Sequence, residues 1–222
     1  MEVDRKFLAA MLALLILLSC AWAWQSGRLD GLARAASAKL RDITVASIMN
    51  GPYGTMTREM AERIYDIMRK RPEQRAPEEV AYAYNALMWT GQLDRAEEFV
   101  APTAVARQRL QVIREDTPKR GDKHYFVWQT TEAAKPPGNS NPDRAVVLVT
   151  YEYWYEPSPQ TRAYWNMKYW GGRGRTTFEY PLARANGAWV IEDPIGKGHG
   201  DEILETCPDR WPPAHVQPWP PR

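Results

Sequence analysis

The sequence predicts an α+β protein in which an N-terminal membrane helix and a helical stalk precede helices packed in a curved antiparallel sheet. Three observations lead to this fold class. Residues 7–24 form one apolar run, apolar residues recur at three-to-four spacing between residues 28 and 113, and strand-like alternation begins near residue 124. Helices that come before the strands, and do not alternate with them, are typical of a sheet that folds over a group of helices.

The apolar run, FLAAMLALLILLSCAWAW, is eighteen residues long and contains nothing more polar than Ser19 and Cys20. It is near the lower limit for a spanning helix, which needs about 20 residues. Three interpretations stay open. The run is a cleaved signal peptide with residues 21–23 as its cleavage site, an uncleaved anchor with Trp22 and Trp24 at the membrane interface, or a lipoprotein signal in which Cys20 is lipidated. We expect the anchor.

The charges on either side of the apolar run do not favour a body on the extracytoplasmic side. Four basic residues follow the apolar run within residues 28–41, and two acidic residues offset the two basic residues before it. The positive-inside rule therefore leans against an outward-facing body. We nevertheless expect one N-terminal anchor in the cell membrane with the body on the extracytoplasmic side, because a terminal anchor of this kind is usually derived from a signal peptide.

Composition limits the partners. The chain has 29 basic and 27 acidic side chains and a net charge of +2. There is no field of one sign, so nucleic acid is not an expected partner. Cys20 and Cys207 form neither a disulfide framework nor a metal-type spacing, and we expect no cofactor and no metal. The expected partners are the membrane and either an envelope protein or a small hydrophobic ligand, and a homodimer also stays open.

Local signals mark five helical segments before the strands. A hydroxyl side chain, Thr55 or Thr57, caps the second of them, while Pro77 opens the third at its first position and Gly91 lies just past its end. The first helical segment is an amphipathic stalk, and it ends at the turn residues 50–54. The predicted helices cover residues 28–50, 55–71, 77–90, 93–100 and 102–114.

Aromatic and β-branched residues then predict an antiparallel meander. Asn186-Gly187 is a tight hairpin turn, residues 171–174 are expected to be a turn, and His199 is expected on a mobile loop after the last strand. The predicted strands cover residues 124–131, 145–155, 163–170, 176–185 and 189–192. The expected divisions are the signal peptide or anchor (1–27), the stalk (28–54), the α+β domain (55–207) and a Pro-rich tail (208–222).

Two stretches carry a family resemblance. Residues 87–96, LMWTGQLDRA, followed by Phe99, are similar to a passage between the first two helices of the nuclear transport factor 2-like (NTF2-like) superfamily. Residues 186–191, NGAWVI, resemble that family's last hairpin. The resemblance covers residues 77–193 and implies a cone-shaped α+β fold of the membrane-anchored extracytoplasmic type. The family includes isomerase-like enzymes and binding modules, so fold alone does not choose between them.

An isomerase-like member would need a carboxylate base and an oxyanion donor inside the cone. Candidates by residue type do not form a matched constellation, and the catalytic residues stay unknown; these candidates are Asp122, His124, Tyr151, Glu152, Tyr153 and Glu179. The density of Tyr and Trp is typical of a half-buried core or interface face of the sheet, and it is also compatible with an aromatic pocket for a ligand. The candidate ligand-binding residues are Tyr151, Tyr153, Trp128, Trp165 and His124.

We therefore expect a non-catalytic, membrane-anchored module that binds a protein partner or a small ligand on the concave face of the sheet, with a role in cell-envelope assembly. The alternative is an isomerase- or dehydratase-type enzyme that uses the cone pocket. A lipoprotein that stores a hydrophobic ligand is a third hypothesis.

Overall fold

The computed structural model describes residues 28–134, 141–164 and 171–206. The chain divides into two compact units, Met1–Thr44 and Val45–Arg222. Helix α2 (Arg28–Met49) crosses this division, and its last turn belongs to the second unit. From residue 28 onward, the described helices include none that combines the length and apolarity of a membrane span. The predicted anchor, including Cys20, lies outside the described residues, as does the tail from residue 208.

The helices begin and end where local chemistry predicts. The Thr57 hydroxyl accepts a hydrogen bond from the backbone N–H of Met60 at 3.4 Å and so caps helix α3. Pro77 is the first residue of α4, and Thr103 caps α6. Between α2 and the long strands, the helices of the second unit are α3 (Arg58–Arg69), α4 (Pro77–Trp89), α5 (Leu93–Ala96) and α6 (Ala104–Arg120), with 3-10 turns at Pro72–Gln74 and Glu97–Phe99.

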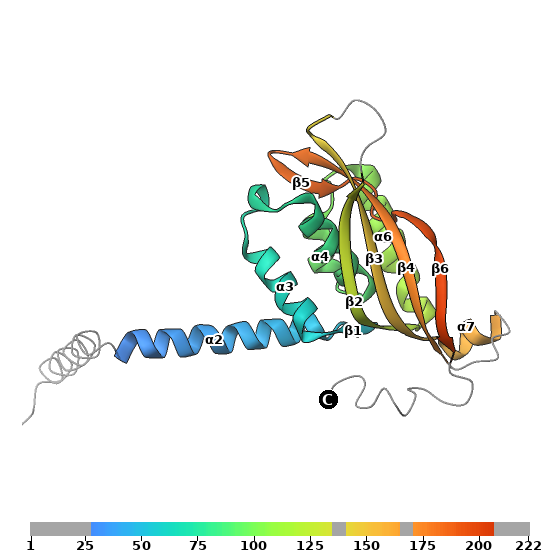
Figure 1. The fold of residues 1–222 in the computed structure, drawn as a ribbon, viewed down its shortest axis with the longest axis horizontal. Helices are drawn as coiled ribbons and strands as arrows, with labels where there is room; N and C mark the ends of the chain where they lie inside the picture. The colour runs from blue at the N-terminus through green and yellow to red at the C-terminus, as the bar shows by residue number, and fades with distance from the viewer. Residues whose placement is uncertain (1–27, 135–140, 165–170, 207–222) are drawn as a thin grey trace, which may run out of the picture. The chain divides into compact units, whose positions relative to one another are not determined.

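The strands form one curled sheet in the order β1-β2-β3-β4-β5, with β6 also paired to β4. Figure 1 shows the long strands β2, β3, β4 and β6 running side by side, with helix α4 against the sheet. Strand β1 is parallel to β2 and all other pairs are antiparallel, so the sheet is mixed and not purely antiparallel. The strands are β1 (Gly54–Met56), β2 (Lys123–Ala134), β3 (Arg144–Glu156), β4 (Gly172–Ala185), β5 (Ala188–Ile191) and β6 (Lys197–Thr206).

The core lies between α4 and the inner face of the sheet. Helix α4 is buried over nine consecutive residues from Val80 to Met88, because it packs against β2, β3 and β5. On the sheet side, Tyr151 and Tyr180 are buried. The α+β class is therefore confirmed, and the tight hairpin turn is confirmed too. Asn186 and Gly187 have φ values of 52° and 83°, as a two-residue hairpin loop requires.

The strand predicted at residues 163–170 is wrong where the structure describes it. Residues Pro159–Tyr164 form helix α7, and residues 165–170 lie outside the described part. The Ser158 hydroxyl accepts a hydrogen bond from the backbone N–H of Thr161 at 3.1 Å. Ser158 is thus the N-cap of this helix and Pro159 its first residue. The turn expected at 171–174 is also wrong, because β4 begins at Gly172.

The loop expected around His199 is instead strand β6. Its position follows from the unequal lengths of β4 and β5. Strand β5 pairs only with residues 182–185 of β4, which leaves the edge of β4 from Gly172 to Glu179 for another strand. Strand β6 pairs along that edge and so satisfies backbone groups that would otherwise need water or another partner.

Candidate functional site

Five aromatic rings meet on the inner face of the sheet, from α4, β2, β3 and β4. We call Trp89, His124, Tyr151, Tyr153 and Phe178 the aromatic cluster. The ring centroid of Trp89 lies 5.3 Å from His124 and 5.6 Å from Phe178, and Tyr153 lies 5.4 Å from both His124 and Tyr151. These separations are in the range of favourable aromatic contacts. The structure thus brings three of the predicted ligand-binding residues together.

The aromatic cluster is only partly covered. Tyr151 is buried, whereas the other four members are half-buried. The indole Nε1 of Trp89 is buried without a hydrogen-bond partner among the described residues. Burial raises the pKa of the Tyr180 hydroxyl well above its usual range, and the Trp89 indole N–H opposes part of this rise.

Trp128 does not join the aromatic cluster, although strict alternation from His124 and Phe126 would place it there. The β2–β3 register shifts between Phe126 and Trp128, and this bulge changes which face the following residues occupy. Trp128 pairs with Glu152 on the outer face and is 44% exposed. Gln129 takes the inner position opposite Tyr151. Trp165, the remaining predicted ligand residue, lies outside the described residues.

A buried polar network lies beside the aromatic cluster and was missed by the sequence interpretation. The Tyr180 hydroxyl donates to Asn85 Oδ1, Asn85 Nδ2 donates to Gln129 Oε1, and Gln129 Nε2 donates to the Tyr82 carbonyl, each at 2.8 Å. These bonds connect α4 with β2 and β4. The detectable signal was Asn85 itself, an amide within an apolar helix, because such a buried group needs partners.

The three candidate carboxylates are held away from the aromatic cluster. Glu152 accepts hydrogen bonds from Arg175 Nη2 at 2.6 Å and from Arg173. Burial raises its pKa, but these arginine hydrogen bonds more than compensate and hold the pKa below its usual value. Glu179 lies 3.0 Å from His199 Nε2, and Asp122 accepts from the Ser158 backbone N–H at 2.8 Å.

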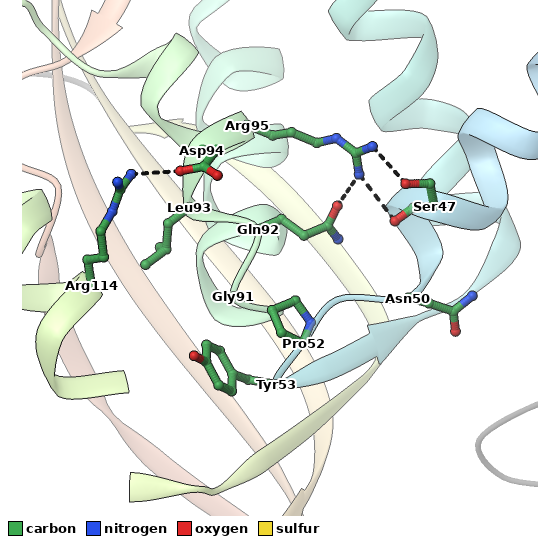
Figure 2. Close-up of a pocket in the computed structure, with 10 residues that line it drawn as sticks. All are labelled: Ser47, Asn50, Pro52, Tyr53, Gly91, Gln92, Leu93, Asp94, Arg95 and Arg114. Carbon is green, nitrogen blue, oxygen red and sulfur yellow. Dashed lines mark hydrogen bonds and ion pairs between the residues drawn. The ribbon is translucent and has the colours of Figure 1, made fainter. Parts of the chain in front are cut away.

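A second site is an open cleft of about 500 Å³ in the second unit. It is bounded by the last turn of α2, the turn before β1, the segment between α4 and α5, and the side of α6 (Figure 2). Its lining residues are Ser47, Asn50, Pro52, Tyr53, Gly91, Gln92, Leu93, Asp94, Arg95 and Arg114. Six of the lining side chains are polar or charged: Ser47, Asn50, Gln92, Asp94, Arg95 and Arg114.

Side chains in this cleft cap the C-terminus of α2, whose last carbonyls lack helical partners. Arg95 Nη1 donates to the Ser47 carbonyl at 3.1 Å, and Arg95 Nη2 donates to the Ser47 hydroxyl at 2.8 Å. Gln92 Nε2 donates to the Ile48 carbonyl at 2.6 Å, and the Gln92 carbonyl oxygen accepts from Arg95. Figure 2 shows Arg95 reaching across to Ser47. Both capping residues belong to the stretch that carries the family resemblance.

No family model and no curated protein matches this sequence. Several solved structures are similar to it, among them the following two. The intermembrane space region of the chloroplast protein ARC6 has 11% identity and a TM-score of 0.37, over 57% of this chain and 92% of that one. A Xanthomonas campestris protein, described as a calcium/calmodulin dependent protein kinase II association domain, has 13% identity and a TM-score of 0.30, over 52% and 78%. At these scores neither carries an argument about function. The curled sheet with α4 on its inner face is compatible with the predicted cone.

Proposed function

We propose that this chain is a membrane-anchored, non-catalytic binding module of the NTF2-like type with a role in cell-envelope assembly. Its aromatic cluster would contact a protein partner or a small apolar ligand. The observation that carries the proposal is the placement of the candidate acids. Each is engaged by a partner outside the aromatic cluster, while four of the five cluster residues are only half-buried.

An isomerase-type reaction needs a base of suitable pKa within reach of the proton that it removes, and a free donor for the developing oxyanion. Glu152 is a poor base for this purpose, because its arginine partners stabilise the carboxylate and lower its pKa. The Tyr180 hydroxyl already donates to Asn85. The described inner face therefore offers aromatic rings for contact. The polar groups of its hydrogen-bond network bond to one another.

The test follows the indole N–H resonances of Trp89 and Trp128 by NMR, in a chain that starts at Arg28. Trp89 belongs to the aromatic cluster and Trp128 lies on the opposite face of β2, so the two residues are a matched pair. The probe is 1-anilinonaphthalene-8-sulfonate. We expect saturable shifts at Trp89 and unchanged Trp128. Shifts at Trp128 alone would place the contact surface elsewhere.

The enzyme alternative has its own measurement. 5-Androstene-3,17-dione is a substrate for isomerases that move a double bond next to a carbonyl group, and its product absorbs as a conjugated enone. We expect no acceleration above buffer. Turnover that is lost on replacing Tyr153 with Phe would contradict the non-catalytic proposal, because that substitution removes only a hydroxyl from the aromatic cluster.

A further inference from the structure

We propose that the aromatic cluster binds a small organic cation, such as a quaternary ammonium compound, between the rings of Tyr153 and Phe178 and the carboxylate of Asp201. This inference rests on the function proposed above, because it names the chemical class of the ligand at the same rings. It adds strand β6, which carries Asp201, to the surface that meets the ligand.

Asp201 lies on the same face of the sheet as the aromatic cluster. Tyr151 is opposite Thr176 in the β3–β4 pair, and Thr176 is opposite Asp201 in the β4–β6 pair. Directly opposite residues of antiparallel strands point to one face. Because Tyr151 is on the inner face, Asp201 is on the inner face too. The backbones of Tyr151 and Asp201 are two strand spacings apart, or about 10 Å, since β6 runs beside β4 (Figure 1).

Two rings of the aromatic cluster extend toward β6. A Cβ on Gly174 would lie 3.0 Å from Cζ of Tyr153, and a Cβ on Gly198 would lie 3.6 Å from Cζ of Phe178. Gly174 is opposite Tyr153 on the next strand, and Gly198 is opposite Phe178 on the next strand again. Each ring therefore ends over a glycine in the direction of β6. No side chain of these two glycines stands between the rings and Asp201.

Asp201 brings a negative charge to this face that no protein cation balances. Its side chain is exposed, and it forms no ion pair among the described residues. Burial raises the pKa of the Tyr151 hydroxyl well above its usual range, and the Asp201 carboxylate adds to this rise. The charge of Asp201 thus acts on the aromatic cluster. The next acid along β6, Glu202, instead pairs with Arg175 at 3.3 Å on the outer face.

Rings and a carboxylate together favour a cation. The face of an aromatic ring attracts a positive charge within about 6 Å of its centroid, and quaternary ammonium groups are recognised in this way. A carboxylate beside the rings adds a direct attraction between opposite charges. An uncharged ligand gains neither contribution, and an anion meets the rings against the charge of Asp201. The chemistry of this surface therefore favours an organic cation.

The test compares choline with 3,3-dimethyl-1-butanol, in which a carbon atom replaces the charged nitrogen and the shape is kept. Each compound is titrated into the full chain in dodecyl maltoside at neutral pH. The indole N–H resonances of Trp89 and Trp128 report on the inner and outer faces by NMR. We expect saturable shifts at Trp89 with choline, unchanged Trp128, and about tenfold weaker binding of the alcohol, because the attractions to the charge are lost.

A matched pair of variants tests the role of Asp201. Asp201→Asn removes the charge and keeps the size of the side chain, so we expect choline to bind about threefold more weakly, with the attraction to the rings remaining, and the alcohol to bind as before. Glu202→Gln removes the same charge from the neighbouring, outward-facing position and is expected to leave choline binding unchanged. Equal binding of choline and the alcohol, or equal effects of the two variants on choline, would overturn the inference.

The results also separate this inference from the function on which it rests. If 1-anilinonaphthalene-8-sulfonate shifts Trp89 while choline and the alcohol bind equally, only the cationic ligand is refuted. If none of the three compounds gives a saturable shift at Trp89, the inference and the proposed contact surface both fail.

Discussion

Replacing Asn85 with Ala tests whether the buried network holds α4 to the sheet. Asn85 is fully buried, accepts from the Tyr180 hydroxyl and donates to Gln129 Oε1, both at 2.8 Å. The substitution removes both partners at once. It leaves the buried Tyr180 hydroxyl and the buried Gln129 amide oxygen without these hydrogen bonds.

The magnitude follows from the groups left unpaired. Each buried polar group that loses its partner costs about 1–3 kcal/mol, so two such groups and a small cavity should lower the free energy of unfolding by about 3–5 kcal/mol. Tyr180→Phe leaves only the Asn85 oxygen unpaired and should cost about 1–3 kcal/mol. In the double variant both ends of the Tyr180–Asn85 hydrogen bond are removed, so two of the three penalties disappear, and the two effects should fall short of additivity by at least about 2 kcal/mol.

The assay is urea unfolding at 25 °C and neutral pH, followed by far-UV circular dichroism on the chain that starts at Arg28. Gln111→Ala is the control, because the Gln111 amide is on the surface and donates to the exposed Glu115, and the substitution should change the free energy of unfolding by less than about 0.5 kcal/mol. A cost for Asn85→Ala as small as that of the control, or strict additivity with Tyr180→Phe, would refute the reasoning.

Three further predictions concern pH, backbone and anchor. Glu152 has a pKa lowered from its ordinary value of 4.5 by its arginine partners; its stabilising contribution should be complete above pH 4.5 and lost as the pH falls through the lower folded pKa. Glu152→Gln should thus destabilise the chain at neutral pH and not in acid, and a pH-independent difference in unfolding would contradict this. Gly91→Ala should cost more than Gly200→Ala in thermal unfolding, because both glycines have positive φ but only Gly91 would meet a ring; equal losses would argue against that contact. Cys20→Ser should leave membrane attachment intact in fractionation, and release of the chain would favour lipidation over the anchor.

Much of the fold could be predicted because its signals are local. Pro77 and Gly91 mark the limits of α4 through backbone chemistry that acts within a few residues. Alternation placed Tyr151 and Tyr153 on one face of β3, and both are in the aromatic cluster. Asn186 and Gly187 formed the expected turn because they readily adopt positive φ. The predicted anchor stays a prediction.

The sequence by itself therefore determined where most helices and strands begin and end, since caps, turns and periodicity act along the chain. Only the tertiary structure decided that Trp128 faces outward, because a one-residue bulge against β3 reverses its side. It also decided that residues 197–206 form a strand, since the exposed edge of β4 supplies their hydrogen-bond partners. The cleft of Arg95 and Arg114 joins segments up to 67 positions apart, from Ser47 to Arg114, and no local pattern records such a meeting.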